Sequence, residues 1–483
     1  MKVLFINPWQ KTLFGDEKAR PGHPHLGLAY LVAVLKKAGH SCAVFDQGLE
    51  NDDDLLFRRL HDWQPDLVGI TSFSFSIDYA ADLIRRIKEV SDVPVIIGGA
   101  HVSAVRERVL EETVADFAMY GECETAILDF LVQLGGERDF AKVPNLIRRT
   151  EECGLVANPA TAMISELDDL PYPDFEAFEF ERYNYYSAKA LPIITSRGCP
   201  YKCNYCSVKL SMGRGFRKRN PESIVDEMEF WKKRYGIRRF EVNDDCFSLD
   251  LKRAEAICDL IIERKLGITY EMYNGIRADR VSEVLLRKMK ASGCVFVSFG
   301  CESGDQEIVY NMGKKLKLED VRNAVELTRK VGIRNSVNFI VGHRNETFEA
   351  FQRTLDFAAS LPTDFVNFYN LVPYPGTEVY EWMKAEARQL IPDQEFLSRI
   401  GSRNFEPVYE TDEFPRADRI RAMELGNALY EKTVLIYRFG RVAGTLAYLV
   451  SRNRTLFTIG RKLALDNPIG FFIYSKVTAA SRR

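Results

Sequence analysis

Short apolar runs alternate with segments of helical periodicity along the first 135 residues. The apolar runs are rich in Val, Ile and Phe, as buried strands are, whereas the segments between them place apolar residues three and four apart. The predicted strands are 3–7, 41–45, 67–71, 94–97 and 117–120, and the predicted helices are 28–38, 52–63, 78–90 and 104–113. Because such alternation specifies a parallel sheet flanked by helices, we expect a Rossmann-like, doubly wound α/β domain over residues 1–135.

Residues 136–190 lack sustained periodicity and contain a Leu-Pro-Tyr-Pro-Asp turn signal at 170–174, so we interpret them as a connector. From 191 to 385 the strand–helix pattern repeats six times. The predicted strands are 191–195, 240–243, 269–274, 296–300, 336–341 and 365–370. Six units are too few to close an eight-stranded barrel, which predicts an open, partial (β/α)6 barrel. Residues 386–483 are expected to form a helical C-terminal region.

Composition narrows the class of protein. The chain has 483 residues, 46% of them hydrophobic, and a net charge of −2, which argues against a nucleic-acid partner. It has no run of 18 uncharged apolar residues and no signal-peptide pattern at its start. Its ten cysteines are irregularly spaced, as expected of a reducing, cytoplasmic compartment.

Three cysteines follow the first strand of the predicted barrel. Cys199, Cys203 and Cys206 have the spacing C-x3-C-x2-C. Three thiolates from one short loop can hold three corners of a four-iron cluster and leave the fourth iron open to a small molecule. A structural zinc site would need a fourth, distant ligand such as Cys246, and a disulfide with a spare thiol suits a secreted chain. The spacing favours the cluster over these alternatives and over coincidence.

The strands of the first domain end in loops that are typical of ligand sites. Ligands on doubly wound sheets lie beyond the carboxyl ends of the strands, and paired glycines let a backbone approach them closely. A plain sheet with tight turns explains the same loops nearly as well. The candidate residues are Thr71, Ser72, Gly98, Gly99, His101, Gly121 and Glu122.

Several segments resemble one family. The run Thr-Ser-Arg-Gly-Cys-Pro-Tyr-Lys-Cys-Asn-Tyr-Cys at 195–206 resembles the cluster-binding loop of radical S-adenosylmethionine (radical SAM) enzymes, which place an aromatic residue before the third cysteine. The runs Pro-His-Leu-Gly-Leu-Ala-Tyr-Leu at 24–31, Gly-Gly-Ala-His at 98–101 and Gly-Glu-Cys-Glu-Thr at 121–125 resemble the cobalamin-binding domain that precedes many of these enzymes. The resemblance extends over roughly residues 1–385.

The resemblance implies that a 4Fe–4S cluster on the three cysteines binds S-adenosyl-L-methionine (SAM). Glu302 lies in a Glu-Ser-Gly segment whose acid contacts SAM in the family; the alternative is an acid favoured by a helix N-terminus. The loop 339–347 departs from the family, since His343-Arg-Asn replaces Leu-Pro-Gly. His343 is therefore either an ordinary loop residue or a general base or substrate contact. The implied SAM-binding residues are Tyr205, Asn243, Asp244, Glu302, Ser336 and Ile340.

The resemblance also implies cobalamin, bound by the seven strand-end residues of the first domain. The motif D-x-H-x-x-G, which supplies a histidine below the cobalt in other cobalamin domains, is absent, and His23 and His25 precede Gly27 at the wrong offsets. We therefore expect cobalt without a protein histidine ligand. The alternative is a vestigial domain that binds no cobalamin.

The resemblance further implies a methyltransferase that acts on an unactivated carbon through a 5′-deoxyadenosyl radical and methylcobalamin. A radical SAM enzyme for a non-methylating rearrangement or oxidative cyclisation is the alternative within the family, and an iron–sulfur electron carrier or sensor is the alternative outside it. The expected partners are a small-molecule or lipid substrate and a reductant such as flavodoxin or ferredoxin. The remaining barrel cysteines, including Cys246 and Cys301, are expected to be buried residues or, less simply, radical relays.

The last 51 residues differ in composition from the rest. Segment 433–483 carries nine Lys and Arg residues against one acid, Asp466, interleaved with aliphatic and aromatic residues. This pattern suits either a helix that lies on an anionic membrane surface or a helical cap with a solvated basic face.

Overall fold

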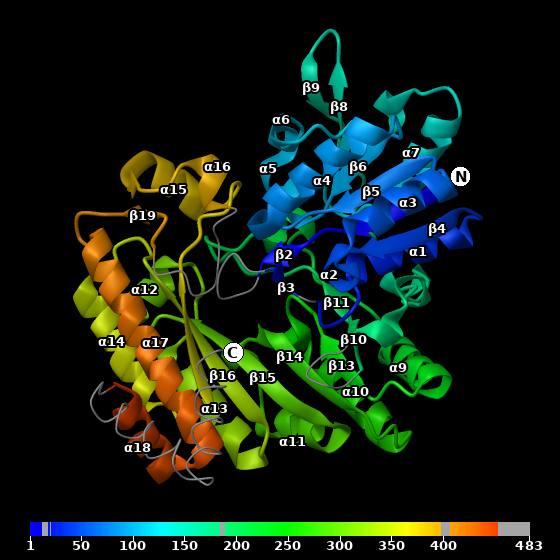
Figure 1. Ribbon diagram of the computed structural model, residues 1–483. Coiled ribbons are helices and arrows are strands. Elements are labelled where there is room, and N and C mark those ends of the chain that lie inside the picture. The colour runs from blue at the N-terminus through cyan, green and yellow to red at the C-terminus, as the bar shows by residue number, and fades with distance from the viewer. Residues whose placement is uncertain (12–17, 20, 184–188, 398–405, 453–483) are drawn as a thin grey trace, which may run out of the picture.

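The computed structural model describes residues 1–11, 18–19, 21–183, 189–397 and 406–452. Figure 1 shows two α/β units: the N-terminal sheet in blue and cyan, and a second sheet in green and yellow, with helices α17 and α18 along the second unit. The strand–helix alternation along the chain thus produces the α/β class that the sequence predicts.

The first sheet has seven strands, and five of them match the prediction. Its strand order is β4-β1-β5-β6-β7-β8-β9, in which β4 to β7 are mutually parallel. The strands are β1 (Lys2–Asn7), β4 (Ser41–Asp46), β5 (Leu67–Thr71), β6 (Val95–Gly98), β7 (Phe117–Met119), β8 (Leu146–Thr150) and β9 (Gly154–Ala157). The chain passes from β1 to β4 on one side and then to β5 on the other. The strand order therefore reverses beside β1, where doubly wound sheets bind ligands.

Three of the four helices predicted for this unit are present, the fourth is divided, and the helices at 47–50 and 126–135 were not predicted. The helices of this unit are α1 (Leu26–Lys37), α2 (Gln47–Glu50), α3 (Asp53–Trp63), α4 (Ile77–Val90), α5 (Ala100–Val105), α6 (Val109–Glu112) and α7 (Ala126–Gly135). The helix predicted over 104–113 is divided, because Arg106 adopts a φ of 57° that a right-handed helix does not permit.

The segment expected to be a connector also adds strands to the first sheet. β8 pairs antiparallel with β7, and β9 pairs antiparallel with β8. The sequence prediction missed this hairpin because its outer strand is only half buried and charged residues at 148–152 obscure the alternation of apolar and polar positions.

The second sheet confirms the six predicted barrel strands. All six are parallel and follow one another in chain order, so the sheet is open. They are β10 (Ala190–Ile193), β13 (Arg239–Val242), β14 (Thr269–Ile276), β15 (Cys294–Glu302), β16 (Arg334–Val341) and β17 (Phe365–Asn370). Their helices are α9 (Pro221–Tyr235), α10 (Leu251–Glu263), α11 (Glu283–Ser292), α12 (Gln306–Asn311), α13 (Leu318–Val331) and α14 (Phe348–Ser360).

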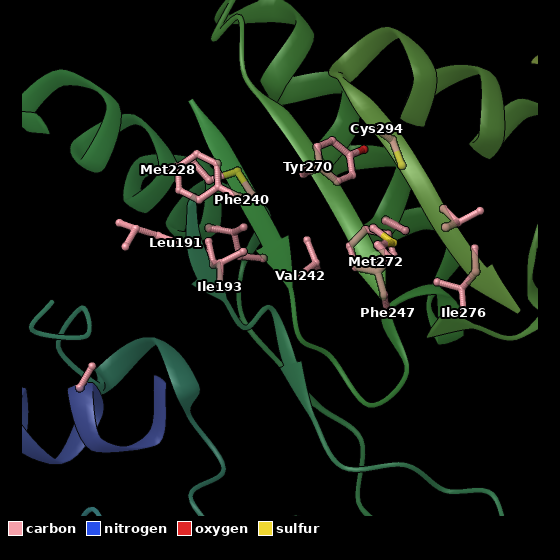
Figure 2. Close-up of a cluster of buried hydrophobic side chains, with 14 of the residues drawn as sticks. Leu191, Ile193, Met228, Phe240, Val242, Phe247, Tyr270, Met272, Ile276 and Cys294 are labelled. Atoms are coloured by element: carbon pink, nitrogen blue, oxygen red, sulfur yellow. The ribbon is translucent and has the colours of Figure 1, made fainter. Parts of the chain in front are cut away.

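The two faces of the second sheet differ in polarity. Figure 2 shows apolar side chains such as Leu191, Phe240, Val242 and Met272 gathered in one cluster, and all four are buried in the core. Because side chains alternate along a strand, the residues between them point into the barrel lumen. The lumen face includes polar residues such as Ser298, whose hydroxyl accepts a hydrogen bond from Ser336 at 3.0 Å.

The described chain has further strands and α-helices outside the two sheets and the helices named so far. They are β2 (Gln10–Lys11), β3 (Lys18–Ala19), β11 (Ser196–Arg197), β12 (Arg217–Lys218), β18 (Arg388–Gln389), β19 (Tyr409–Glu410), α8 (Val208–Ser211), α15 (Glu378–Glu386), α16 (Asp393–Phe396), α17 (Arg416–Phe439) and α18 (Arg441–Arg452). α17 packs on β17, where a Cβ added at Gly426 would lie 2.5 Å from the ring of Phe368. Within the described ranges, no helix is long and apolar enough to span a bilayer.

Candidate functional site

The cysteine loop leaves the second sheet directly after β10 and β11. Cys199, Cys203 and Cys206 are all half-buried and carry free thiols. Gly198 begins the loop with a φ of 82°, and a Cβ there would collide with the backbone of Gly215, so only glycine fits. The backbone of the cysteine loop is thus closely packed where the loop begins.

Asn204, in the middle of this loop, is held by residues from two other elements. Its amide nitrogen donates to Asn311 O at 2.8 Å, its backbone N–H donates to Met312 O at 3.0 Å, and its Oδ1 lies 3.0 Å from His343 Nε2. His343 is buried, and burial lowers its pKa to about 4, so the ring is neutral near pH 7. His343 therefore contacts the cysteine loop.

The three thiols have different surroundings. A hydrogen bond with the Cys246 thiol lowers the pKa of Cys199 to about 7, whereas burial raises the pKa of Cys203 and raises that of Cys206 to about 11. In the described part of the chain no three His, Cys, Asp or Glu side chains converge as ligands of a single metal ion. A four-iron cluster takes one thiolate on each of three irons, so its ligands need no common point.

The acidic run after β13 holds the start of the cysteine loop. Asp244 is buried and accepts hydrogen bonds from Thr195 N at 2.6 Å, Thr195 Oγ1 at 2.5 Å and Ser196 Oγ at 2.6 Å. Asp245 accepts from Gly198 N at 2.8 Å. Asn243 differs: its buried Oδ1 has no hydrogen-bond partner among the described residues, and its side chain lines a cavity. Of the three, Asn243 is the one with an atom to offer a ligand.

A second cluster of side chains lies at the end of β15. Glu302 Oε1 accepts from Lys314 Nζ at 2.6 Å and from Tyr205 OH at 3.1 Å. Burial opposes a charge on Lys314, but the Glu302 carboxylate outweighs it and raises the pKa of Lys314. Glu302 has a φ of 72°, a costly conformation for a non-glycine residue that is concentrated at functional sites.

The structure brings some of the predicted SAM residues together and separates others. Tyr205 and Ile340 pack against the same apolar cluster beside Glu302, whereas Ser336 lies four residues below Ile340 on β16. The sequence did not identify Lys314 as a site residue, because a lysine that follows a glycine in a loop matches no motif. Only the fold places it against Glu302.

A cavity of about 570 Å³ lies between the two sheets. Five of the seven residues proposed for cobalamin line it: Thr71, Gly98, Gly99, Gly121 and Glu122. The opposite wall comes from the second unit through Ile194, Arg197, Met212 and Asn243. A single cavity thus joins the carboxyl ends of the strands of the first sheet to the start of the cysteine loop.

The two other proposed residues do not line the cavity themselves, and their side chains bind protein groups. Ser72 donates to Gly98 O at 2.9 Å. His101 is fully buried, with Nδ1 3.1 Å from Ser74 Oγ and Nε2 2.8 Å from Glu112 Oε2. The contribution of these two residues to cobalamin binding stays a prediction.

The shape of the cavity fits a large ligand that approaches the backbone. The backbone of Gly99 lines the cavity, and a Cβ there would lie 2.6 Å from Ser72 O, so only glycine fits. Asn243, whose buried Oδ1 has no hydrogen-bond partner among the described residues, also contributes to the lining. His25 also lines the cavity, but its Nδ1 accepts from Leu28 N at 3.2 Å and its Nε2 lies 3.4 Å from Thr71 Oγ1. The neighbouring His23 faces Glu241 at 3.4 Å.

Buried ion pairs join the two walls of the cavity. Arg197, which precedes Gly198, pairs with Glu122 at 3.1 Å and with Glu124 at 2.7 Å. Arg217 of β12 pairs with the second oxygen of Glu122 at 2.6 Å. Burial opposes the charge on Glu122, but the two arginines lower its pKa below the usual range. We name Glu122, Glu124, Arg197 and Arg217 the interdomain ion network.

Comparison with known proteins assigns each of the two units to a known domain family. The B12 binding domain model matches residues 17–131, and the Radical SAM superfamily model matches residues 193–358. An uncharacterized methyltransferase of Pyrococcus horikoshii is 30% identical over 79% of this chain and 83% of its own. The chain belongs to the family of cobalamin-dependent radical SAM enzymes. It is accordingly an enzyme whose cofactors are a 4Fe–4S cluster, SAM and cobalamin.

One further relative and one solved structure are also similar to this chain. The anaerobic magnesium-protoporphyrin IX monomethyl ester cyclase of Rubrivivax gelatinosus is 28% identical over 79% of this chain and 70% of its own. The radical SAM methyltransferase TsrM of Kitasatospora setae, solved with cobalamin and a 4Fe–4S cluster bound, superposes with a TM-score of 0.67 at 22% identity, over 78% of this chain and 73% of that one. The latter shows that the fold is shared.

The interdomain ion network predicts a large stability cost for Glu122→Gln. The substitution leaves Arg217 and Arg197 buried with only Glu124 to balance them, which should lower the free energy of unfolding by about 3 kcal/mol or more. Urea unfolding followed by circular dichroism measures it. Glu179→Gln, in an exposed ion pair with Arg182, is the matched control and should cost less than about 1 kcal/mol. Equal costs for the two variants would contradict a structural role for the network.

Proposed function

We propose that this enzyme is a methyltransferase that acts on an unactivated carbon of a small-molecule or lipid substrate. The observation that carries the proposal is the single cavity that joins the cobalamin-type sheet to the cysteine loop, because methyl transfer needs both cofactors near one substrate carbon. When bound, the cluster supplies the electron that cleaves SAM, and cobalamin carries the methyl group. The names of the Pyrococcus relative and of TsrM support this choice.

We propose the following division of the chain. Residues 1–135 form the cobalamin-binding domain, 136–190 the connector with its added hairpin, 191–385 the radical SAM partial barrel, and 386–483 the C-terminal region. Cys199, Cys203 and Cys206 hold the cluster.

In the SAM site, the residues of this chain bind, orient and exclude water. The Glu302 carboxylate suits the ammonium group of SAM, and the Lys314 ammonium, which donates to Glu302 at 2.6 Å, offers further donors for the SAM carboxylate. Tyr205 packs beside them with Ile340, and the apolar residues Ile308 and Met312 keep the site dry. Asn243 faces the shared cavity. Asp244 and Ser336 are also proposed SAM contacts, and both already bind protein groups.

In the cobalamin site, Thr71, Gly98, Gly99, Gly121 and Glu122 form the wall of the first domain, with Ser72 and His101 behind it. We propose that no protein histidine lies below the cobalt. Both ring nitrogens of His25 and of His101 already face protein groups, which supports this arrangement. A flavodoxin or ferredoxin is proposed as the reductant in the cytoplasm.

A second candidate is a non-methylating radical reaction such as an oxidative cyclisation. It is favoured by the similarity to the Rubrivivax cyclase over 79% of this chain. Both candidates require the cluster and SAM, and they differ in whether S-adenosylhomocysteine is formed.

Methyl transfer predicts two products from SAM. Protein purified without oxygen from cobalamin-fed cells should hold about four irons and one cobalamin per chain. It should form S-adenosylhomocysteine once per bound cobalamin before any substrate is added, as measured by chromatography. Cys199/Cys203/Cys206→Ala should lose iron and 5′-deoxyadenosine formation yet keep cobalamin, and Cys153→Ala, at an exposed thiol, should keep all of these. Deoxyadenosine without S-adenosylhomocysteine would select the non-methylating reaction.

The Glu302–Lys314 pair predicts a specific loss of SAM affinity. Glu302→Gln removes a charge-assisted contact worth about 1.5–3 kcal/mol, so the dissociation constant for SAM should rise about 10- to 100-fold. Equilibrium dialysis of the iron-loaded protein measures it. Glu307→Gln, at an exposed acid on α12, should leave the constant unchanged. An unchanged constant in Glu302→Gln as well would remove Glu302 from the SAM site.

The C-terminal segment predicts peripheral binding to anionic membranes. Residues 453–483 lie outside the described structure, but α18 exposes Val442, Leu446 and Leu449 on one face between basic residues. Val442/Leu446/Leu449→Ser should lower co-sedimentation with phosphatidylserine vesicles several-fold. The matched control replaces the exposed Val90, Val114 and Val132 of the first domain by Ser. Equal sedimentation of both triple variants and the unchanged chain would reject the membrane contact.

A further inference from the structure

The lower end of the second sheet carries a strongly basic cavity, far from the cysteine loop. It has a volume of about 570 Å³ and is lined by the first residues of several strands. Four of its lining side chains are cationic and one is an acid, Glu271. We name the cationic residues Lys189, Arg238, Arg239 and Arg334 the cationic collar.

The strand register places two members of the collar, Arg239 and Arg334, on the lumen side of the sheet together with Glu271. Glu271 pairs in register with Phe296, and Phe296 pairs with Arg334, so the three side chains share one face. On β16, Arg334 is followed at intervals of two by Ser336, Asn338 and Ile340. Since alternate residues of a strand face the same way, the collar and the SAM site lie at opposite ends of one lumen.

A single buried acid orders two of the arginines. Glu271 receives two hydrogen bonds from Arg239 Nη2, at 2.8 and 2.9 Å, and its Oε1 lies 3.8 Å from Arg334 Nη2. Arg334 also donates to Tyr437 OH of α17 at 3.1 Å, and its side chain is still 44% exposed. One carboxylate therefore orients two guanidinium groups without neutralising the collar.

On β15, β16 and β17 the lumen between the collar and the SAM site carries uncharged side chains, several of them polar. Ser336 donates to Ser298 Oγ at 3.0 Å, Asn338 donates to the same oxygen at 2.8 Å, and Asn367 donates to Asn338 Oδ1 at 2.9 Å. The rings of Tyr273 and Phe296 lie 4.7 Å apart on the same face. From Arg334 to Ile340 the strand rises on the order of 20 Å.

We propose that the cationic collar is a subsite for the anionic end, phosphate or carboxylate, of an elongated substrate. Oriented guanidinium groups bind both anions through paired N–H donors, and an excess of positive charge attracts them. The uncharged part of the substrate lies along Asn338 and Asn367, the half-buried members of the polar Ser298–Ser336–Asn338–Asn367 ladder, and its reacting carbon reaches the SAM site. This assignment rests on the proposed function, since it takes the barrel lumen as the substrate site.

Calorimetric titration of the anaerobically purified full chain tests the subsite, with inorganic pyrophosphate and citrate as separate probes. Binding of pyrophosphate alone assigns the collar to phosphate, and binding of citrate alone assigns it to carboxylate. Arg334→Gln should weaken binding of the probe at least tenfold, and Arg334→Lys, which keeps the charge but loses the paired donors, should weaken it by less than Arg334→Gln does. Arg287→Gln, at an exposed arginine of α11 paired with Glu283, is the matched control and should bind as the unchanged chain does.

Two outcomes would overturn the subsite. One is that neither probe binds the unchanged chain at millimolar concentration. The other is that Arg334→Gln and Arg287→Gln weaken binding equally, which would mean general attraction of anions to a basic surface. Tyr437→Phe removes only the hydroxyl beside Arg334 and should leave binding within twofold, which separates the charge from the packing of α17.

These results are independent of the proposed methyl transfer. Anion binding needs neither SAM nor cobalamin, so its loss in Arg334→Gln with normal formation of S-adenosylhomocysteine concerns the collar alone. Absence of S-adenosylhomocysteine in the unchanged chain, with anion binding intact, would reject methyl transfer and keep the subsite.

Discussion

The arrangement of the two cofactor sites depends on the buried charge of Arg197. This guanidinium lies between Glu122 and Glu124 of the first domain, and the next two residues along the chain are Gly198 and Cys199. A buried arginine is tolerated only where carboxylates balance it, so the loop after β7 and the cysteine loop must come together for either to be stable. The cavity walls of both units are thereby fixed in one geometry.

A second constraint comes from the alternation of side chains along the barrel strands. One face of each strand is apolar and packs against the helices, and the other is free to carry chemistry because the six-stranded sheet stays open. The lumen changes from charged to polar to apolar along β16, from Arg334 through Ser336 and Asn338 to Ile340, which packs against the same apolar cluster as Tyr205. Residues that pack in the core and residues that are free to carry chemistry therefore occupy opposite faces of the same strands.

Polar residues near the cofactor sites fall into two groups, those that hold the loops and those that face a ligand. Asp244, His101 and His343 are buried with protein partners, and they fix the loops that present other groups. Asn243 and Glu302 face the cavity or the end of the barrel. An acid or histidine at a strand end is typical of both groups, and the difference lies in whether its lone pairs are already used by neighbours.

The sequence by itself determined the local features of this protein. The hydrophobic period sets the order of strands and helices, the spacing C-x3-C-x2-C sets three thiolates in one loop, and both are properties of neighbouring residues. The sequence did not predict the hairpin of β8 and β9, because a half-exposed, charged strand shows no clear alternation of apolar and polar residues. Only the tertiary structure shows that Lys314 contacts Glu302, that the collar surrounds Glu271, and which acids pair with Arg197. Each of these contacts joins residues from separate segments, and Coulomb attraction and desolvation depend on distances in space that no sequence pattern specifies.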